Sequence, residues 1–220
     1  GLQPARQAIW DHLRGTPFTV ERLQPAVFTH FGTLHEYWRM VASNQGLADL
    51  CDWQQHASAW CRTLEEHVDR RRLLLINAAV EGVIQSESEP VLITDSHLAG
   101  GLSGQGPALV AGVHTSQAIA IPPNVVIHQM PVDGGFVTRV LGLYDDPKRA
   151  WDDPSATFIN RPWSEWLTEA GLTAEAVWPE NLPVERTLWN ASLYPVVADR
   201  EESLRLALPL PDPAQAPAGW

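Results

Sequence analysis

The chain of 220 residues has few cysteines, no excess of basic charge and no long apolar run. Two cysteines, Cys51 and Cys61, are too few for a disulfide framework. Against 26 Asp and Glu residues stand only 15 Lys and Arg residues, and the net charge of −11 argues against a nucleic-acid partner. No apolar run approaches the ~18–20 residues that span a bilayer, and no secretory signal opens the chain. These absences favour a cytoplasmic protein that binds neither nucleic acid nor membrane.

Chemical motifs are equally scarce. The glycine-rich run at residues 100–106 lacks the Gly-Lys-Ser/Thr ending of a phosphate-binding loop. The eight histidines form no His-Glu-x-x-His motif and no cluster with cysteine at metal-ligand spacing. No Gly-x-Ser-x-Gly nucleophile elbow is present. The sequence by itself therefore predicts no catalytic residue, no metal site and no cofactor in this chain.

The first third of the chain carries helical patterns. Residues 4–14 predict a short helix, with proline suited to its first turn and glycine after its end. Thr33 and Glu36 form a capping box, which predicts that a helix begins there. Apolar residues at steps of three and four predict a second helix over residues 50–72. Two short strands are expected between the first helix and the capping box, at residues 18–23 and 27–31.

Between residues 73 and 143, β-branched residues and glycines replace the helical period. Leu92, Leu98 and Val110 lie on a step of six, with Gly104 at the missing position. A second row on the same step holds Ser96, Leu102 and Ala108. A step of six is typical of a parallel β-helix, whose sides take six residues each and turn at small residues. We expect the first row to point inward, although periodicity alone leaves an antiparallel meander equally open.

The last part of the chain predicts a linker, short helices and a tail. The linker covers residues 145–162, and three short helices are expected at residues 164–170, 173–177 and 201–208. Prolines predict a poorly ordered tail at residues 209–220. Ten tryptophans exceed what a surface tolerates. We therefore expect burial of most of Trp53, Trp60, Trp163, Trp166 and Trp189.

Four segments, with the 163–166 helix before the last of them, carry a family resemblance. They are Phe28–Thr33, Ile121–Val132, Gly135–Lys148 and Arg186–Val196. Read in order over residues 18–200, they resemble the middle of the L-fucokinase/GDP-L-fucose pyrophosphorylase family, the bifunctional enzymes of fucose salvage. In that family a nucleotidyltransferase domain joins guanylyl to fucose 1-phosphate, a left-handed β-helix follows, and a sugar kinase comes last.

The resemblance implies a mixed α/β fold with a helical N-terminal segment, a small left-handed parallel β-helix and a helical C-terminal cap. Residues 1–72 would hold the end of the transferase domain and a helical connector. The β-helix would occupy residues 73–146, the cap residues 147–208 and the tail residues 209–220. The glycine-rich signature that holds GTP and the phosphate loop of the kinase are both absent from this chain. We therefore expect a non-catalytic portion that completes the transferase fold and spaces or oligomerises domains.

The segment from Phe28 to Thr33 resembles the closing strand of sugar nucleotidyltransferases. Their pattern is aromatic, any, Asp, any, Gly, Thr, and its Asp helps to hold the catalytic magnesium. His30 stands at that position here, and a neutral imidazole is a poor ligand for this oxygen-seeking ion. The resemblance thus implies magnesium for the parent enzyme but no metal site here. It offers His30, Gly32 and Thr33 as contacts to substrate. Arg139, considered apart from the resemblance, is either a group within reach of a phosphate or an exposed charge on a strand.

The partners that the resemblance implies are the missing transferase and kinase domains, a second copy of the chain, and the parent substrates GTP and fucose 1-phosphate. Two other classes of function remain open on the residues alone. One is a free-standing β-helix acyltransferase of the hexapeptide type, with His97, His114 or His128 as general base. The other is an interaction module without chemistry. We expect the isolated chain to be inactive in guanylyl transfer.

Overall fold

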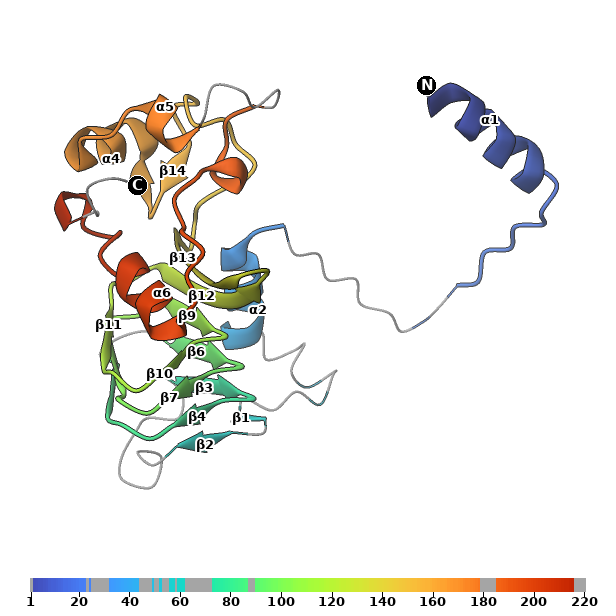
Figure 1. Cartoon of the computed structure of the whole chain (residues 1–220). Coiled ribbons are helices and arrows are strands. Elements are labelled where there is room, and N and C mark those ends of the chain that lie inside the picture. Colours follow the sequence, from blue (N-terminus) through green and yellow to red (C-terminus); the bar gives the residue numbers. More distant parts are fainter. Residues whose placement is uncertain are drawn as a thin grey trace. The chain divides into compact units, whose positions relative to one another are not determined.

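A computed structural model describes residues 2–22, 24, 32–43, 49, 52, 56–57, 59–61, 73–86, 90–178 and 185–215 (Figure 1). The chain divides into two compact units, residues 1–30 and 31–220, which are described separately. In the first unit, helix α1 (Leu2–Leu13) confirms the helix predicted at the start of the chain. Residues 17–22 form no strand, so the strand predicted there is wrong. The strand predicted at 27–31 lies outside the described residues.

Three sheets of parallel strands wind around a common core in the second unit. The first sheet has the order β1-β3-β6-β9-β12-β13, and only β13 within it runs antiparallel. Its strands are β1 (His56–Ala57), β3 (Leu73–Ile76), β6 (Val91–Thr94), β9 (Ala108–Ala111), β12 (Val125–Val132) and β13 (Gly135–Gly142). The second sheet holds β2 (Trp60–Cys61), β4 (Ala79–Val80), β7 (His97–Leu98) and β10 (His114–Thr115). The third holds β5 (Ile84–Ser86), β8 (Leu102–Gly104) and β11 (Ile119–Ile121).

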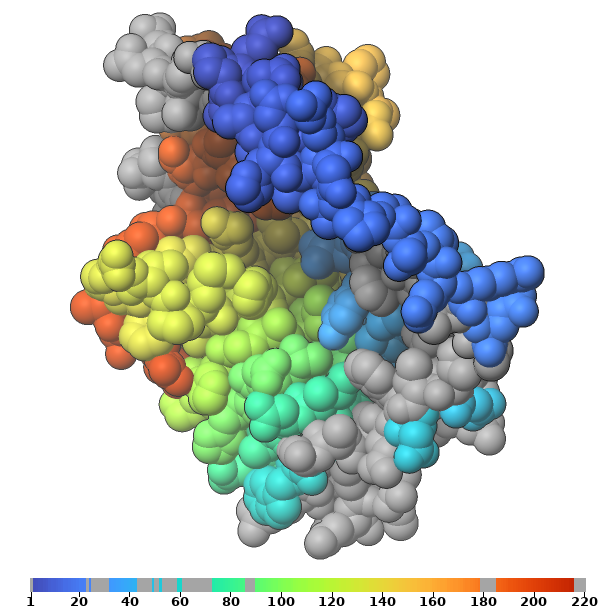
Figure 2. Space-filling model, turned by 90° about the vertical axis from the view of Figure 1, so that its right-hand side faces the viewer, coloured from blue at the N-terminus to red at the C-terminus, as the bar shows by residue number. Residues whose placement is uncertain are grey.

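The parallel pairing makes a β-solenoid of about three turns, which confirms the parallel alternative over the meander. One turn takes 18 residues from Leu73 to Val91 and 17 residues from Val91 to Ala108. In the space-filling view the turns form layers, from cyan through green to the yellow β12–β13 hairpin (Figure 2). That antiparallel hairpin lies within the stretch predicted as β-helix. The left-handed sense of the coil and the domain limits at residues 72, 146 and 208 stay predictions.

The six-residue rows are buried, but they do not all face the same way. Leu98 and Val110 belong to the core inside the solenoid, as predicted. Leu92 is also buried, yet it lies in a second apolar cluster on the outer face of the first sheet. Val110 pairs with Ile93 rather than with Leu92, because that turn is one residue shorter than three hexads. The expectation that Leu92 points inward is therefore wrong.

Helix α2 (Leu34–Ser43) covers that outer face and begins where the capping box predicted. Trp38 and Val41 are its buried residues, and both belong to the outer cluster. The cluster's other buried members lie on the sheet and just after it: Leu74, Leu92, Leu109, Val126 and Leu143. Burying a large aliphatic side chain is worth roughly 1.5–3 kcal/mol, so this face holds α2 on the solenoid.

The helix predicted over residues 50–72 is wrong where the structure describes that stretch. Strands β1 and β2 lie there and pair with β3 and β4, adding an incomplete turn below the solenoid. Trp60, counted as part of the apolar helix face, is 54% exposed in β2. Most of the rest of that stretch, including Trp53, lies outside the described residues. None of the described helices is long and apolar enough to span a bilayer.

A helical cap follows the solenoid and confirms the predicted short helices. Its elements are hairpin β14 (Thr157–Phe158) and β15 (Arg161–Pro162), helices α4 (Trp163–Ala170), α5 (Ala174–Val177) and α6 (Arg200–Ala207), and the 3₁₀ turns η2 (Leu188–Asn190) and η3 (Pro213–Gln215). Gly171 ends α4 in the left-handed conformation, at φ 66°. Phe158 stacks on Trp163 with ring centroids 4.6 Å apart, and Trp166 meets it edge-on at 4.8 Å.

Of the four named tryptophans that the structure describes, two are buried and two are exposed, so burial of most of them is not confirmed. Trp163 and Trp166 are buried, but Trp189 is 64% exposed. The linker and tail expectations need correction as well. Residues 157–162 form a hairpin rather than a linker, and Phe158 is completely buried. In the tail, Leu210 is buried and its carbonyl accepts a hydrogen bond from Trp166 Nε1 at 3.1 Å. Residues 216–220 lie outside the described part.

Candidate functional site

The N-terminus of α2 holds the two predicted contact residues that the structure describes, Gly32 and Thr33. The backbone N–H groups of both donate to one oxygen of Glu36, at 2.7 and 3.0 Å. In return, the Glu36 N–H donates to the Thr33 hydroxyl at 3.1 Å. This reciprocal arrangement is the predicted capping box, which satisfies N–H groups that would otherwise lack a helical partner.

The capping box engages the backbone N–H groups of Gly32 and Thr33, the residues that the resemblance offers as contacts to substrate. A carboxylate at a helix N-terminus is also favoured by the helix dipole, so a ligand must displace Glu36 to reach these amides. The structure therefore brings Gly32 and Thr33 together as a helix cap. His30, the third candidate, lies outside the described residues. A contact of these three residues with substrate stays a prediction.

Thr33→Ala is expected to lower the free energy of unfolding by about 1 kcal/mol, because the Glu36 N–H loses its acceptor. Thr33→Ser keeps the hydroxyl and should stay close to the wild-type value. Urea denaturation of the three proteins, followed by tryptophan fluorescence, measures the differences. An equal loss in both variants would show that the methyl group, rather than the hydroxyl, supports the helix.

An aromatic contact joins the start of α2 to the end of the solenoid. The rings of His35 and Tyr144 lie with centroids 4.5 Å apart and planes tilted by 39°. Tyr144 follows β13, and its backbone N–H donates to the Asn160 side chain at 3.3 Å. The start of α2, which directly follows Gly32 and Thr33, therefore lies beside the segment that leads from the solenoid into the cap.

Asp145, in that same segment, is the most heavily bonded buried polar group of the described residues. Its side chain is buried, and each carboxylate oxygen accepts two hydrogen bonds. One oxygen accepts from the Thr157 hydroxyl at 2.7 Å and the Asn160 N–H at 3.0 Å. The other accepts from the N–H groups of Gly142 at 2.6 Å and Ile159 at 2.7 Å. The carboxylate thus ties the end of β13 to the β14–β15 hairpin.

Burial raises the pKa of Asp145 above its ordinary value, against the opposing effect of its four hydrogen bonds. Two of its donors, Ile159 and Asn160, have positive φ angles of 51° and 60°. The β-branched Ile159 rarely adopts this conformation, so the surrounding bonds hold it there. Asn160 in turn donates through Nδ2 to the Asn124 carbonyl at 2.7 Å. Both carboxylate oxygens of Asp145 and the side-chain amide of Asn160 bond other parts of the chain, so Asp145 acts as a structural hub.

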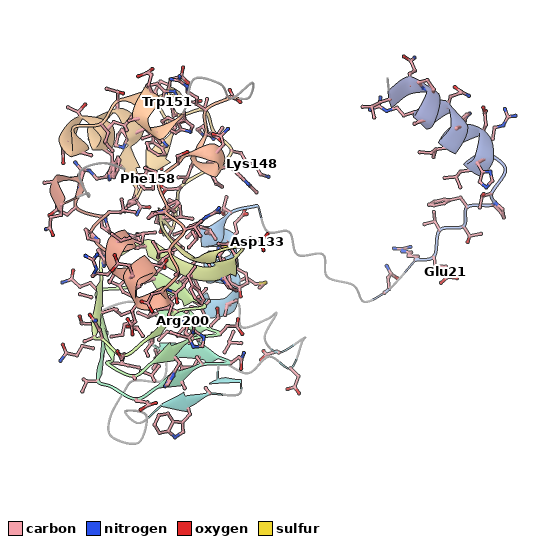
Figure 3. The ribbon with its side chains drawn as sticks, viewed as in Figure 1. Glu21, Asp133, Lys148, Trp151, Phe158 and Arg200 are labelled. Carbon is pink, nitrogen blue, oxygen red and sulfur yellow. The ribbon has the colours of Figure 1, made fainter. Side chains whose placement is uncertain are left out.

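The third and fourth family segments lie side by side beyond this hub. The Trp189 N–H donates to the Pro147 carbonyl at 3.0 Å, and the Trp151 N–H to the Arg186 carbonyl at 2.9 Å. The Lys148 ammonium lies 5.9 Å from the centroid of the exposed Trp189 ring (Figure 3). The sequence pattern alone gave no sign that these segments meet.

Arg139 is exposed on β13, directly opposite His128 on β12. Burial, followed by the charge of Arg139, lowers the pKa of His128. Within the described ranges, no three His, Cys, Asp or Glu side chains come together in a way that could hold a metal ion. The structure thus shows a helix cap at Gly32 and Thr33, a buried hub at Asp145 and an exposed Trp189 beside Lys148.

Fold and site together define a parallel β-solenoid with an outer helix and a helical cap. A family model described as the fucose pyrophosphorylase domain matches residues 1–199. The chain belongs to this family, which confirms the resemblance carried by the four segments. It is 27% identical over 191 residues to the bifunctional fucokinase/GDP-fucose pyrophosphorylase of Arabidopsis thaliana, covering 82% of this chain and 17% of that protein. No solved structure matches the chain.

Proposed function

We propose that this chain is the non-catalytic, left-handed β-helix portion of a fucose-1-phosphate guanylyltransferase. In this role it completes the transferase fold and spaces or oligomerises the domains of a bifunctional parent enzyme in the cytoplasm. The observation that supports the proposal is that Gly32 and Thr33, the described candidate contacts, form the N-terminal cap of α2. Glu36 engages the amides of Gly32 and Thr33, and α2 buries Trp38 and Val41 on the solenoid. Helix α2, which directly follows Gly32 and Thr33, is thereby held on the solenoid.

The chemistry of the reaction also supports a non-catalytic role for this chain, with catalysis in the transferase domain of the parent enzyme. In guanylyl transfer, an oxygen of fucose 1-phosphate attacks the α-phosphorus of GTP and pyrophosphate leaves. Such a step needs cations and preorganised donors around the transferring phosphoryl group. In the proposal these groups, with the magnesium ion, belong to the transferase domain of the parent enzyme. The net charge of −11 on this chain disfavours binding of a nucleoside triphosphate.

The isolated chain is expected to bind no GTP and to form no GDP-fucose. Calorimetric titration with GTP and Mg²⁺ measures the binding, and pyrophosphate release with fucose 1-phosphate measures the turnover. GTP binding in the micromolar range, or turnover above a no-protein blank, contradicts the proposal.

A chimera tests the supporting role directly. In it this chain replaces the stretch of the Arabidopsis enzyme that it matches. GDP-fucose formation should persist in the chimera and be lost when that stretch is deleted. A His30→Ala chimera separates support from substrate contact. A rise in KM for fucose 1-phosphate with unchanged kcat assigns His30 to the substrate, whereas unchanged constants restrict the loop to support.

A further inference from the structure

One row of side chains on the second solenoid sheet faces outward. The equivalent positions on β2, β4, β7 and β10 are occupied by Trp60, Ala79, His97 and His114. Val80 and Leu98, which follow two of these residues in the chain, are completely buried in the core. Successive residues of a strand point to opposite faces, so the row lies on the outside of the solenoid. Trp60 stands at its lower end, on the outermost described strand of the sheet (Figure 1).

The row has a gap beside Trp60. Neighbouring strands lie about 4.8 Å apart, so His97 stands two strand spacings from Trp60, with only the methyl group of Ala79 between them. The His97 Nε2 lies 2.6 Å from Glu81 Oε1, and its ring meets the His114 ring edge-on, with centroids 6.5 Å apart. The imidazole of His97 is engaged by these contacts, whereas Trp60 is 54% exposed.

An open hollow of about 400 Å³ lies at this end of the row. Three successive turns of the solenoid line it, through Ala59, Trp60, Asn77, Ala78, Ala79 and Ser96. Backbone hydrogen bonds fix its floor, since the Trp60 N–H donates to the Ala78 carbonyl at 3.0 Å and the Ala79 N–H to the Ser96 carbonyl at 2.8 Å. A volume of this size falls within the range of small-molecule sites, about 300–1,000 Å³.

Asn77 supplies the polar group of this hollow. It takes the left-handed conformation, at φ 49°, as does Asp95 at the same corner of the next turn, at φ 50°. The Asn77 Nδ2 donates to Asp95 Oδ1 at 2.7 Å, which fixes the plane of the amide. Among the described residues none bonds the Asn77 Oδ1 or its second N–H, so the amide keeps an acceptor and a donor for a ligand. Ser96 differs, because its hydroxyl already donates to the Thr94 carbonyl and accepts from the Val113 N–H.

Two carboxylates lie near the hollow. Asp95 is bonded to Asn77, and Glu81 follows Ala79 by two residues. None of the residues that line the hollow is lysine or arginine. A negative potential repels phosphates and other anions. The ligand that suits the hollow is therefore uncharged, with an apolar face for the indole of Trp60 and hydroxyl groups for the amide of Asn77.

We propose that this hollow binds the ring of a neutral pyranose sugar, which stacks on Trp60 and donates a hydroxyl hydrogen bond to Asn77 Oδ1. One face of a pyranose carries C–H groups, which the electron-rich face of an indole attracts, while hydroxyl groups project from its rim. The gap above Ala79 is one strand position wide, which limits the ligand to a single ring. The inference goes beyond the proposed function, which assigns no ligand to the solenoid.

Nuclear magnetic resonance of the full chain, labelled with a nitrogen isotope, tests the site. The probes are the methyl pyranosides of L-fucose, D-mannose and D-glucose. At least one should shift the Trp60 indole N–H and the backbone N–H groups of residues 77–79 along one saturable curve, with a Kd on the order of 1 mM for a single ring on an open surface. The 1-phosphate of the sugar that binds best should bind at least about threefold more weakly, because of the two carboxylates. No saturable shift with any glycoside, or tighter binding of the phosphate, overturns the proposal.

Three variants locate the bound sugar, with binding followed at the N–H groups of residues 77–79 and folding at those of β9. Trp60→Ala should weaken binding at least about threefold, because the sugar loses its stacking surface. Asn77→Gly should do the same, since glycine adopts the positive φ angle at this corner and only the amide is lost. Trp189→Ala is the matched control, which removes a tryptophan that is 64% exposed in the cap and should leave the Kd unchanged. Unchanged binding in Trp60→Ala or Asn77→Gly, or an equal loss in Trp189→Ala, overturns the proposal.

Discussion

Asp145→Ala is expected to lower the free energy of unfolding by about 4 kcal/mol, because it leaves four donors without an acceptor, two of them buried and two part-buried. The carboxylate accepts bonds that join the end of β13, the β14–β15 hairpin and, through Asn160, the turn at Asn124. Losing it also releases Ile159 from its positive φ angle. Chemical denaturation monitored by far-ultraviolet circular dichroism and tryptophan fluorescence measures the change.

Asp145→Asn should cost less than Asp145→Ala, about 2 kcal/mol. Each carboxylate oxygen accepts two bonds, so an amide nitrogen at either position must face at least one backbone N–H. The neighbouring Asp146→Ala serves as control. Asp146 is half-exposed, pairs with Arg149 at 3.3 Å and accepts from the Lys148 N–H at 3.1 Å, and such a surface ion pair is worth no more than about 1 kcal/mol. Equal stability of the Asp145 and Asp146 variants would show that the buried bonds contribute nothing net.

Sequence patterns predicted the elements whose signals are local. The capping box at Thr33 needs only four residues, and α2 starts at Leu34 as expected. Gly171 ends α4, and Asp199 caps α6 by accepting from the Glu202 N–H. Helix propensity and capping act within one or two helical turns, so all the residues that take part are close together in the sequence.

The errors arise where distant residues decide the outcome. Apolar steps of three and four over residues 50–72 matched a helix, but Trp60 pairs with Ala79 in the next solenoid turn. Strand pairing with another turn overrides helical periodicity, and nothing local signals it. Leu92 matched a six-residue row, yet one turn of 17 residues puts Ile93 inside and Leu92 under α2. A one-residue shift moves a strand residue to the opposite face.

At the candidate site, too, residues that are distant in the sequence decide the structure. Asp145 looked like the first residue of a polar linker, because its donors lie as much as 15 residues further along the chain. One signal could have indicated burial: the aspartate follows an apolar strand and precedes a second apolar pair, Phe158–Ile159. Gly32 and Thr33 came from a family resemblance that implied substrate contact, whereas their local chemistry implied a helix cap. The cap is what the structure describes.

Gly100→Ala is expected to lower the free energy of unfolding by about 3 kcal/mol, through direct overlap between solenoid turns. A Cβ at Gly100 would lie 2.1 Å from the Gln117 carbonyl carbon and 2.3 Å from the Ala118 nitrogen. Both are backbone atoms of the turn above, held between β10 and β11, so neither can rotate away. Gly82 meets the same restriction one turn below, where its Cβ would lie 2.3 Å from the Gly101 nitrogen. Thermal unfolding by calorimetry measures the loss.

Gly104→Ala, four residues further in the same glycine-rich run, should instead raise the free energy of unfolding. A Cβ there would meet the Ile121 carbonyl oxygen at 3.5 Å and the Ile121 Cβ at 3.8 Å, which are ordinary contacts. Gly104 lies in β8, where alanine reduces the conformational freedom of the unfolded chain, so the variant should gain about 0.5 kcal/mol. The two substitutions add the same methyl group, and only the distance to the next turn differs. If both variants lose stability equally, backbone propensity rather than the close stacking of turns explains these glycines.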